Sequence, residues 1–449
     1  MGIDFLLRNF KENAGAEAVI WQDATYTYDW LCQRIRHWRE RIRRQSLPSG
    51  SVVVLEADFS PNSIALLLTL VEHNCIVVPL TKAVGSRSRE FMAIAQGEVS
   101  FSIDDRDKVA VRQLPNTADH AIYRRLREAN RPGLVLFSSG STGQPKAAVH
   151  DFVPLLEKFC VRRSSYRTIT FLLYDHIGGV NTLLYTLSNA GCLVTVRDRS
   201  PDGVLRAVEA YRVELLPTSP TFLNLVLLSE AYRRYDLTSL KLVTYGTEPM
   251  PQGTLQRIHE LFPDVRLLQT YGLSELGIMH SKSRSSDSLW VKIGGDGFET
   301  RIVDGVLQIR AKSAMLGYLN APSPFTEDGW FDTQDSVEVD GEYIRVLGRK
   351  SEIINVGGEK VYPAEVENII QDVESVREVT VYGEKNPITG QIVCARVVAK
   401  EGVEPGAVVA RIKAACRKRL AKFKVPVKVS VVKDSLHSER FKKVRVKCP

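Results

Sequence analysis

The chain has 449 residues, with 44% hydrophobic and 25% charged residues and a net charge of +8 at pH 7. This length can bury a large core and is typical of more than one domain, and the balance is that of an ordinary globular protein. The longest apolar run, around residues 64–71, is too short to span a bilayer, and the N-terminus fits neither a signal peptide nor the myristoylation pattern. Seven cysteines lie far apart and form no CxxC pair, so we expect reduced thiols in a soluble cytoplasmic protein without a membrane span.

Apolar runs of strand length alternate with helical segments over the first 270 residues. The predicted strands cover residues 51–56, 75–80, 134–137, 168–173, 192–196, 213–217, 241–245 and 266–270. The predicted helices between them include residues 62–72, 203–211 and 252–261. This alternation favours α/β layers with largely parallel sheets.

The pattern changes twice in the second half of the chain. From about Gly294 it becomes short β-rich pieces separated by Gly turns, and after Arg349 a new β/α pattern begins with helices at 363–371 and 407–420. We therefore predict a large N-terminal domain of layered α/β subdomains with a small β-rich subdomain, over residues 1–348. A small α+β C-terminal domain follows over residues 349–449.

A loop rich in Gly and hydroxyl groups follows the predicted strand at 134–137, and the segment reads LFSSGSTGQPKAAVH over 136–150. Glycines let the backbone turn several N–H groups toward one anion, and Ser and Thr hydroxyls add donors. Lys146, directly after the loop, would add a point charge for a phosphate. The spacing differs from that of the nucleotide triphosphatases, since no Gly-Lys-Ser/Thr follows. Taken alone, the same residues fit a polar surface turn equally well.

The loop closely resembles the signature T-S-G-[ST]-T-G-x-P-K-G of the adenylate-forming superfamily, which comprises acyl-CoA synthetases, aryl-CoA ligases and adenylation domains. Four further segments resemble the family's motifs in the family's order: TYGLSE at 270–275, DGWFDTQD at 328–335, GRKSEIINVGGEKVYPAEVE at 348–367 and LHSERFKKVR at 436–445. The resemblance spans nearly the whole chain. The chain departs from the pattern at Ala147, Phe152, Gln334 and Ser351.

The resemblance implies an enzyme that activates a carboxylic acid with ATP, releases pyrophosphate and passes the acyl group to a thiol. The acceptor would be CoA or the phosphopantetheine of an acyl or aryl carrier protein. Both partners of the first step are anionic, so the site must supply positive charge and fixed geometry. The family's C-terminal domain is mobile, and the resemblance places its hinge at Ser351.

The resemblance also assigns the nucleotide site. Its implied ATP- and AMP-binding residues are Ser138, Ser139, Gly140, Ser141, Thr142, Gly143, Lys146, Gly246, Thr247, Glu248, Thr270, Tyr271, Gly272, Ser274, Asp335, Arg349 and Lys443. Glu275 would hold Mg²⁺, a hard cation that prefers oxygen ligands. Asp335 and Arg349 would bind the ribose hydroxyls, and Tyr271 would stack on adenine. The alternatives are a solvated acid for Glu275, a surface ion pair for Asp335 and Arg349, and a core aromatic for Tyr271.

Lys443 matches the family lysine that bridges the α-phosphate and the attacking carboxylate. With Thr142 and Glu275 it completes the implied catalytic set. Lys442 is adjacent and stands where the family has Gly, so a register slip to Lys442 is the alternative. A further alternative is that Lys443 is one of many charges in a basic tail and has no specific role.

The acyl pocket and the thiol channel are implied by two further segments. LLYDHIGGVNTLLYTLSNAGCLV resembles the segment that lines the acyl site, which implies His176, Asp175 and Asn181; a structural His explains His176 equally well. Gly357 and Gly358 match the segment that forms the thiol channel, although a turn needing positive φ would explain one of them. Lys424 is a candidate for the cationic surface at the mouth of that channel.

Two other functions compete with this interpretation. The first is an amino-acid-activating enzyme that loads a carrier protein, which Asp175 suggests. Spacing to Gly191, however, places the family's amine-binding Asp near Gly178, which favours an acid without an α-amine.

The second is a nucleic-acid-binding protein, which the basic C-terminal residues suggest. Residues 405–449 hold fourteen Lys or Arg against two acids. That tail has only Phe423 and Phe441 as aromatics, and its helix carries an apolar stripe that predicts packing on a domain core, so we expect no nucleic-acid partner. The stripe consists of Ile412, Ala415, Cys416, Leu420 and Phe423.

Overall fold

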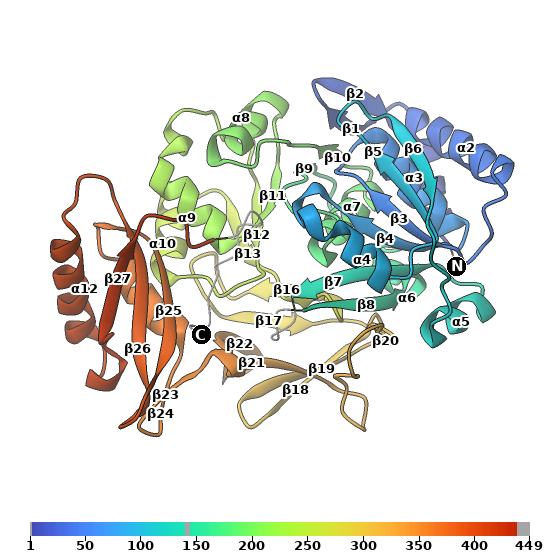
Figure 1. The fold of residues 1–449 in the computed structure, drawn as a ribbon. Helices are drawn as coiled ribbons and strands as arrows, with labels where there is room; N and C mark the ends of the chain where they lie inside the picture. The colour runs from blue at the N-terminus through green and yellow to red at the C-terminus, as the bar shows by residue number, and fades with distance from the viewer. Residues whose placement is uncertain (1, 140–143, 438–449) are drawn as a thin grey trace.

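The computed structural model describes residues 2–139 and 144–437. A large N-terminal domain of three main sheets is followed by a smaller C-terminal domain with its own sheet (Figure 1). The predicted α/β class, with its β-rich subdomain and small α+β domain, is confirmed. In the described ranges, none of the helices combines the length and hydrophobicity that a bilayer crossing needs.

Two seven-stranded sheets form the body of the large domain, and both are parallel except at their edges. The first has the order β13-β12-β11-β9-β10-β1-β2, and the second β20-β8-β7-β4-β3-β5-β6. The strands of the first are β1 (Glu17–Trp21), β2 (Ala24–Thr27), β9 (Arg167–Ile169), β10 (Cys192–Val194), β11 (Leu215–Thr218), β12 (Leu242–Tyr245) and β13 (Arg266–Gln269). Those of the second are β3 (Val52–Glu56), β4 (Ile76–Leu80), β5 (Val99–Ile103), β6 (Val109–Gln113), β7 (Gly133–Ser139), β8 (Pro145–Asp151) and β20 (Gly317–Tyr318). All eight predicted strands are present, although β9 and β10 are shorter than predicted.

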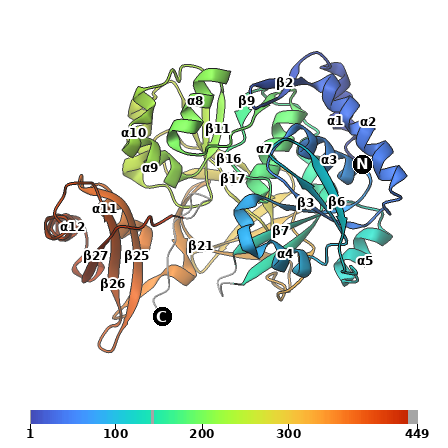
Figure 2. The ribbon, with the colours of Figure 1, turned by 45° about the horizontal axis from the view of Figure 1, so that its top comes forward.

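Helices fill the space between the two sheets and cover their outer faces. The inner core contains α1 (Asp4–Glu12), α2 (Tyr28–Arg44), α3 (Pro61–Glu72), α6 (Phe152–Glu157) and α7 (Ile177–Ser188). The outer face of the first sheet carries α8 (Pro201–Tyr211), α9 (Pro220–Ser229) and α10 (Gln252–Leu261), as Figure 2 shows. The outer face of the second carries α4 (Ser88–Ile94) and α5 (Ala121–Glu128). Helices α3 and α7 are apolar on most of their circumference because each lies in the inner core.

The helix boundaries follow from local chemistry. Ser60 accepts from the backbone N–H of Ser63, whose hydroxyl accepts from the Ser60 N–H in return, and Pro61 occupies the first turn of α3. Ser200 and Pro201 start α8 in the same manner, with the Ser200 hydroxyl accepting from a backbone N–H. These caps explain why the predicted helix limits agree with the structure to within two residues.

The β-rich subdomain is a six-stranded antiparallel sheet with the order β16-β17-β22-β21-β19-β18. Its strands are β16 (His280–Ser283), β17 (Val291–Gly294), β18 (Phe298–Val303), β19 (Val306–Ala311), β21 (Phe331–Asp340) and β22 (Tyr343–Arg349). A two-stranded ladder of β14 (Gly272–Leu273) and β15 (Gly277–Ile278) joins it to β13. This connection positions the segment 270–275 between the parallel sheets and the subdomain.

The sheet of the small domain follows β22 and a short turn of 3₁₀ helix, η3 (Lys350–Glu352). Its sheet contains β23 (Ile354–Val356), β24 (Glu359–Val361), β25 (Val376–Asn386), β26 (Gly390–Ala399) and β27 (Lys428–Val432). Helices α11 (Pro363–Gln371) and α12 (Pro405–Arg419) pack on this sheet, and η4 (Lys422–Lys424) follows α12. The stripe predicted for the basic helix is confirmed, because Ile412 and Cys416 are buried in this core and Ala415, Leu420 and Phe423 pack against it.

Gln334 stands where the family motif has Gly, and its backbone explains that preference. Its φ is +61°, in the left-handed region, and its N–H donates to the Asp332 carboxylate at 2.9 Å. The next residue, Asp335, donates its N–H to the Thr333 hydroxyl at 3.0 Å. This irregular point within β21 thus presents Asp335 at the expense of strain at an exposed Gln.

We predict that Gln334→Gly raises the midpoint of thermal unfolding. The left-handed conformation costs an ordinary L-residue about 1–2 kcal/mol, and the greater freedom of Gly in the unfolded chain offsets about 0.5–1 kcal/mol of that gain. Gln334→Val should lower the midpoint, because a β-branched residue fits this conformation worst. Calorimetry of the three proteins checks the order Gly, Gln, Val; the reverse order would show that the backbone at residue 334 is not strained.

Candidate active site

The signature segment forms the hairpin of β7 and β8. Ser138 and Lys146 lie opposite each other on the two strands, close to the tip of the hairpin. The predicted phosphate-binding residues Gly140, Ser141, Thr142 and Gly143 lie outside the described residues, as does Lys443. Ser139 belongs to β7. The hairpin therefore fixes where the loop begins and ends.

Glu275 lies beside this hairpin and is held by two hydroxyl groups. Ser138 donates to its Oε1 at 3.2 Å, and Tyr318 of β20 donates to the same oxygen at 2.7 Å. The Glu275 residue is only 9% exposed. Lys146 Nζ lies 5.4 Å from the centroid of the Tyr318 ring, in cation–π contact. One carboxylate, one lysine and two hydroxyls thus converge at the base of the loop.

The residues present fit a magnesium ion. Within the described part of the chain both hydroxyls donate to Oε1 of Glu275, which leaves Oε2 as the oxygen that can face a cation. Mg²⁺ commonly takes one or two carboxylates and completes its shell with water and substrate phosphates. The described residues contain no cluster of three His, Cys, Asp or Glu side chains that would form a metal cage by themselves. A single carboxylate next to a phosphate-binding loop matches the first arrangement.

His150 supports the segment that carries Glu275. It is fully buried on β8, with Nε2 at 2.6 Å from the Ser274 carbonyl oxygen and Nδ1 at 3.2 Å from the Ser313 carbonyl oxygen. Burial lowers the pKa of His150 more than these two contacts raise it. A neutral ring donates only one N–H, and the shorter distance assigns it to Nε2, which fixes the backbone at Ser274 and with it the direction of Glu275.

Asp335 and Arg349 face each other across the ladder of β21 and β22. Arg349 Nε lies 3.6 Å from Asp335 Oδ1, and the Tyr271 hydroxyl donates to Oδ2 at 2.5 Å. Burial raises the pKa of Asp335, against the lowering effects of Tyr271 and Arg349, and burial with the Asp335 charge raises the pKa of Tyr271 well above its ordinary value. The structure thus brings together Tyr271, Asp335 and Arg349, although up to 78 positions separate them in the sequence.

The ends of β12 and β13 form the other side of this region. Thr270 donates its N–H and its hydroxyl to the Tyr245 carbonyl oxygen, at 2.8 and 3.1 Å. A Cβ at Gly246 would lie 2.7 Å from the Thr270 carbonyl oxygen, so only Gly permits this approach. Thr247 follows with φ +75°, a strained conformation for a β-branched residue, and Glu248 accepts from the Thr221 N–H at 2.8 Å.

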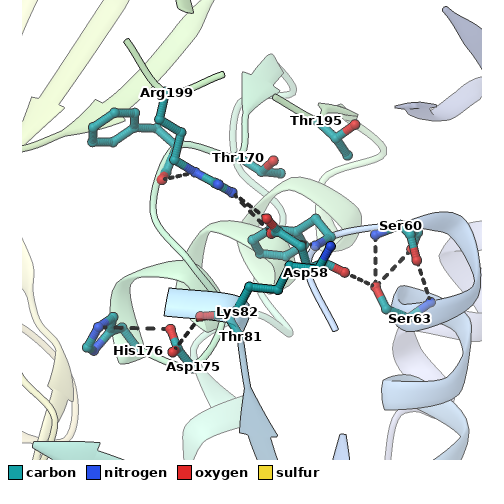
Figure 3. A network of polar contacts seen from close by, with 12 residues as sticks. Asp58, Ser60, Ser63, Thr81, Lys82, Thr170, Asp175, His176, Thr195 and Arg199 are labelled. Atoms are coloured by element: carbon teal, nitrogen blue, oxygen red, sulfur yellow. Dashed lines mark hydrogen bonds and ion pairs between the residues drawn. The ribbon is translucent and has the colours of Figure 1, made fainter. Parts of the chain in front are cut away.

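The residues predicted for the acyl pocket lie in two places. Asp175 is buried before α7, where its Oδ2 accepts from the Thr81 hydroxyl at 2.7 Å and its Oδ1 lies 3.9 Å from His176 Nε2 (Figure 3). Asn181, one turn into α7, instead faces an open cavity of about 320 Å³. Among the described residues that line this cavity are Asn181 and Thr270, but neither Asp175 nor His176.

Lys158 is the polar partner of Asn181 in that cavity. It follows α6 directly, and its Nζ donates to Asn181 Oδ1 at 2.5 Å and to the Ile278 carbonyl oxygen at 2.8 Å. Ile278 pairs with Gly272 in the β14–β15 ladder. Burial, followed by the nearby charge of Arg163, lowers the pKa of Lys158 to about 7.

The small-domain residues predicted for the thiol channel and hinge have clear local roles. Gly357 and Gly358 form the two-residue turn between β23 and β24 with φ +61° and +93°, so the turn accounts for both glycines. Lys424 forms an ion pair with Glu365 of α11 at 2.7 Å. Ser351 is exposed in η3, between the sheets of the two domains.

The described chain ends in a segment anchored to β25. The Glu378 carboxylate accepts from the Leu436 N–H at 2.7 Å and the Ser435 hydroxyl at 3.0 Å, and its Oε2 lies 3.1 Å from His437 Nδ1. Burial opposes the charge on Glu378, but these three contacts outweigh it and lower its pKa to about 2. The same region lines a hollow between α9 of the large domain and α11 and β25 of the small one.

Three residues at this site were not identified from the sequence. Tyr318, His150 and Lys158 belong to none of the matched motifs, and each becomes relevant only through contacts with segments more than 40 positions away. The signal that could have singled out His150 is its position within the strand after the signature loop. No feature of the sequence singles out Lys158 in this way.

Comparison with known protein families identifies the family of this chain. The model of the AMP-binding enzyme family matches residues 6–318, and that of the AMP-binding enzyme C-terminal domain matches residues 365–443. The sequence is 26% identical to an indoleacetate–CoA ligase of Aromatoleum aromaticum, over 96% of this chain and 94% of that protein. It is 23% identical to a 2-succinylbenzoate–CoA ligase of Enterococcus faecalis, over 92% and 91%.

Solved structures share the fold. An anthranilate CoA ligase in complex with anthranoyl-AMP superposes with a TM-score of 0.84 at 20% identity, covering 98% of this chain and 95% of that one. An o-succinylbenzoate CoA synthetase of Bacillus subtilis, in complex with its acyl-adenylate, gives a TM-score of 0.76 at 20% identity, covering 98% and 96%. Ordered motifs, fold and family models agree, and the chain belongs to the family of AMP-binding enzymes as an AMP-forming acid–thiol ligase.

Proposed function

We propose that this chain activates an aromatic carboxylic acid with ATP and transfers the acyl group to CoA. The observation that carries the proposal is the Glu275 carboxylate, held by Ser138 and Tyr318 at the base of the phosphate-binding hairpin. The relatives support an aromatic acid and CoA, since they include ligases named for indoleacetate, 2-succinylbenzoate and ferulate. A cytoplasmic location is part of the proposal, because the six cysteines in the described ranges are free thiols.

In the first step a carboxylate oxygen of the acid bonds to the α-phosphorus of ATP, and the bond from that phosphorus to the pyrophosphate oxygen breaks. Ser141, Thr142 and Lys146 would hold the departing phosphates. Glu275 would hold Mg²⁺, which supplies positive charge between the anionic partners. Lys443 would bring a further charge to the α-phosphate from the small domain.

The nucleoside would lie between the two sides of the site described above. Asp335, backed by Arg349, would accept hydrogen bonds from the ribose hydroxyls. The Tyr271 hydroxyl donates a hydrogen bond to Asp335, which would hold the ring in position to contact the adenine base. Gly246 and Thr247 would line the opposite side of adenine. Ser274 and Gly272 contribute backbone to the same wall.

In the second step the thiol sulfur of CoA replaces AMP on the acyl carbon. We place the domain boundary at 348–351, with Ser351 as the hinge. Gly357, Gly358 and Lys424 would border the channel for the thiol. A carrier-protein phosphopantetheine is the alternative acceptor.

An amino-acid substrate is less well supported. Asp175 accepts a hydrogen bond from Thr81 within the protein, and the cavity beside Asn181 is lined by cations, which would repel an ammonium group. If the cavity beside Asn181 holds the acid, both observations support an acid without an α-amine.

The proposal is tested by pyrophosphate release over a panel of aromatic acids, with hydroxylamine to trap the adenylate. CoA and a phosphopantetheinylated carrier protein are then supplied separately with the best acid, across a salt series. We expect release with aromatic acids and a thioester with CoA. No release with any acid would refute the proposed activation, and adenylate without a CoA thioester would refute the proposed acceptor.

We predict that Lys443→Ala lowers acid-dependent ATP–pyrophosphate exchange by roughly 10²–10³-fold, as for the loss of one preorganised charge. Thioester formation from presynthesised acyl-adenylate should largely survive, because that step does not need the charge at the α-phosphate. Lys442→Ala is the matched control and should retain exchange. If Lys442→Ala loses exchange and Lys443→Ala keeps it, the register assigned to the tail is wrong.

We also predict that Glu378→Gln lowers exchange by roughly 10- to 100-fold, since small misplacements of a reacting group carry penalties of this order. Glu378 anchors residues 435–437, six positions before Lys443. Glu374→Gln, on the exposed turn before β25, is the matched control.

The same carboxylate makes a pH prediction. Because the folded pKa of Glu378 is lowered from 4.5 to about 2, its stabilising effect is complete above pH 4.5 and is lost as the pH falls from 4.5 toward 2. Wild type should therefore lose more stability than Glu378→Gln over this window in thermal unfolding. Equal losses would show that Glu378 does not anchor the segment.

A further inference from the structure

The cavity beside Asn181 extends along the inner face of the first sheet. Its floor is formed by alternate residues of β11, β12 and β13, and its sides by α7 and by residues 278–281. It begins at Thr270, next to the nucleotide-binding segment, and reaches Arg266 at the start of β13. Four residues of strand span about 13 Å. The cavity is therefore long enough for the body of an aromatic acid.

The acidic and basic side chains that line this cavity are all of the basic type. They are Lys158, Arg163, Arg266 and His280, and no Asp or Glu is among the described residues of the lining. Arg163 contacts the His280 ring at 2.8–2.9 Å. Because a guanidinium can only donate, His280 accepts from it and is neutral.

The field in the cavity is positive and poorly compensated. Burial lowers the pKa of His280, and the charges of Arg163 and Lys158 lower it further, while exposed Asp296 is the weakest influence and acts in the opposite direction. The ammonium group of Lys158 has no acid partner in its two hydrogen bonds, which go to a neutral amide and a carbonyl oxygen. Lys158 is partly buried, whereas Arg163 and Arg266 are exposed. A cation withdrawn from water without an acid raises the free energy of the folded protein, and an anion in the cavity would lower that free energy.

We propose that this cavity binds a second anionic group of the substrate, so that the acid activated at Thr270 is an aromatic acid with a second carboxylate. The inference rests on the proposed function and specifies its substrate class. Lys158 and Arg163 are the specificity-determining residues, because they can form charge-assisted hydrogen bonds to that group. Phe159, Tyr166 and Tyr185 also line the cavity and supply the apolar walls for the ring.

The test compares phenylacetic acid with its 4-carboxy, 4-hydroxy and 4-amino derivatives in ATP–pyrophosphate exchange. We expect the 4-carboxy acid to show the highest kcat/KM, by about 10- to 100-fold over phenylacetic acid, as for one hydrogen bond to a charged group. Lys158→Met and Arg163→Met should each remove most of this preference through KM. Lys312→Met, at an exposed lysine of the same domain, should retain it.

A purely structural role for Lys158 would give a different result. Lys158→Met would then lower kcat/KM for all four acids by the same factor, which would overturn the inference, as would a wild-type preference for the uncharged acids. Thermal unfolding without ATP provides a second measurement. The 4-carboxy acid should raise the midpoint of wild type more than phenylacetic acid does, and this difference should vanish in Lys158→Met. An equal shift with both acids contradicts the inference even if no acid is turned over, in which case the proposed function fails separately.

Discussion

The Glu275 carboxylate connects three parts of the large domain that are distant in sequence. It accepts from Ser138 on the β7–β8 hairpin and from Tyr318 on the edge strand β20. Its own segment is fixed by the contact of His150 with the Ser274 carbonyl oxygen. Because β20 is also hydrogen-bonded to β8, one buried acid sets the relative position of the hairpin, the sheet edge and the link to the β-rich subdomain.

The partners of this carboxylate are neutral. Two hydroxyl groups donate hydrogen bonds to it and bring no positive charge of their own. Asp335 follows the same pattern, with the Tyr271 hydroxyl at 2.5 Å and the Arg349 guanidinium farther away at 3.6 Å. The cavity beside Asn181 has the opposite character, with basic side chains at Lys158 and Arg163. The region thus separates a side lined by carboxylates from a side lined by basic groups.

Much of this arrangement could be predicted from the sequence. Strand and helix positions followed from apolar runs bounded by caps such as Ser60 with Pro61, where local chemistry determines the limits. The motifs implied that Asp335 and Arg349 act together, and the structure adds that they are cross-strand partners. Lys158 could not be foreseen, because its burial arises from α7 and from β15, which lies 120 residues farther along the chain. Tyr318 was missed for the same reason, since its role depends on how β20 pairs with β8.

The last strand of the large domain has a mechanical consequence. Arg349 is the final residue of β22, and the chain passes to the small domain through only the exposed turn η3 and one further residue before β23. The ladder with β21 holds Arg349 against Asp335, so torsion of the backbone at 350–352 would be absorbed beyond this pair. The pair therefore belongs to the large domain, and a rotation of the small domain about residues 350–352 would leave the geometry of the pair unchanged.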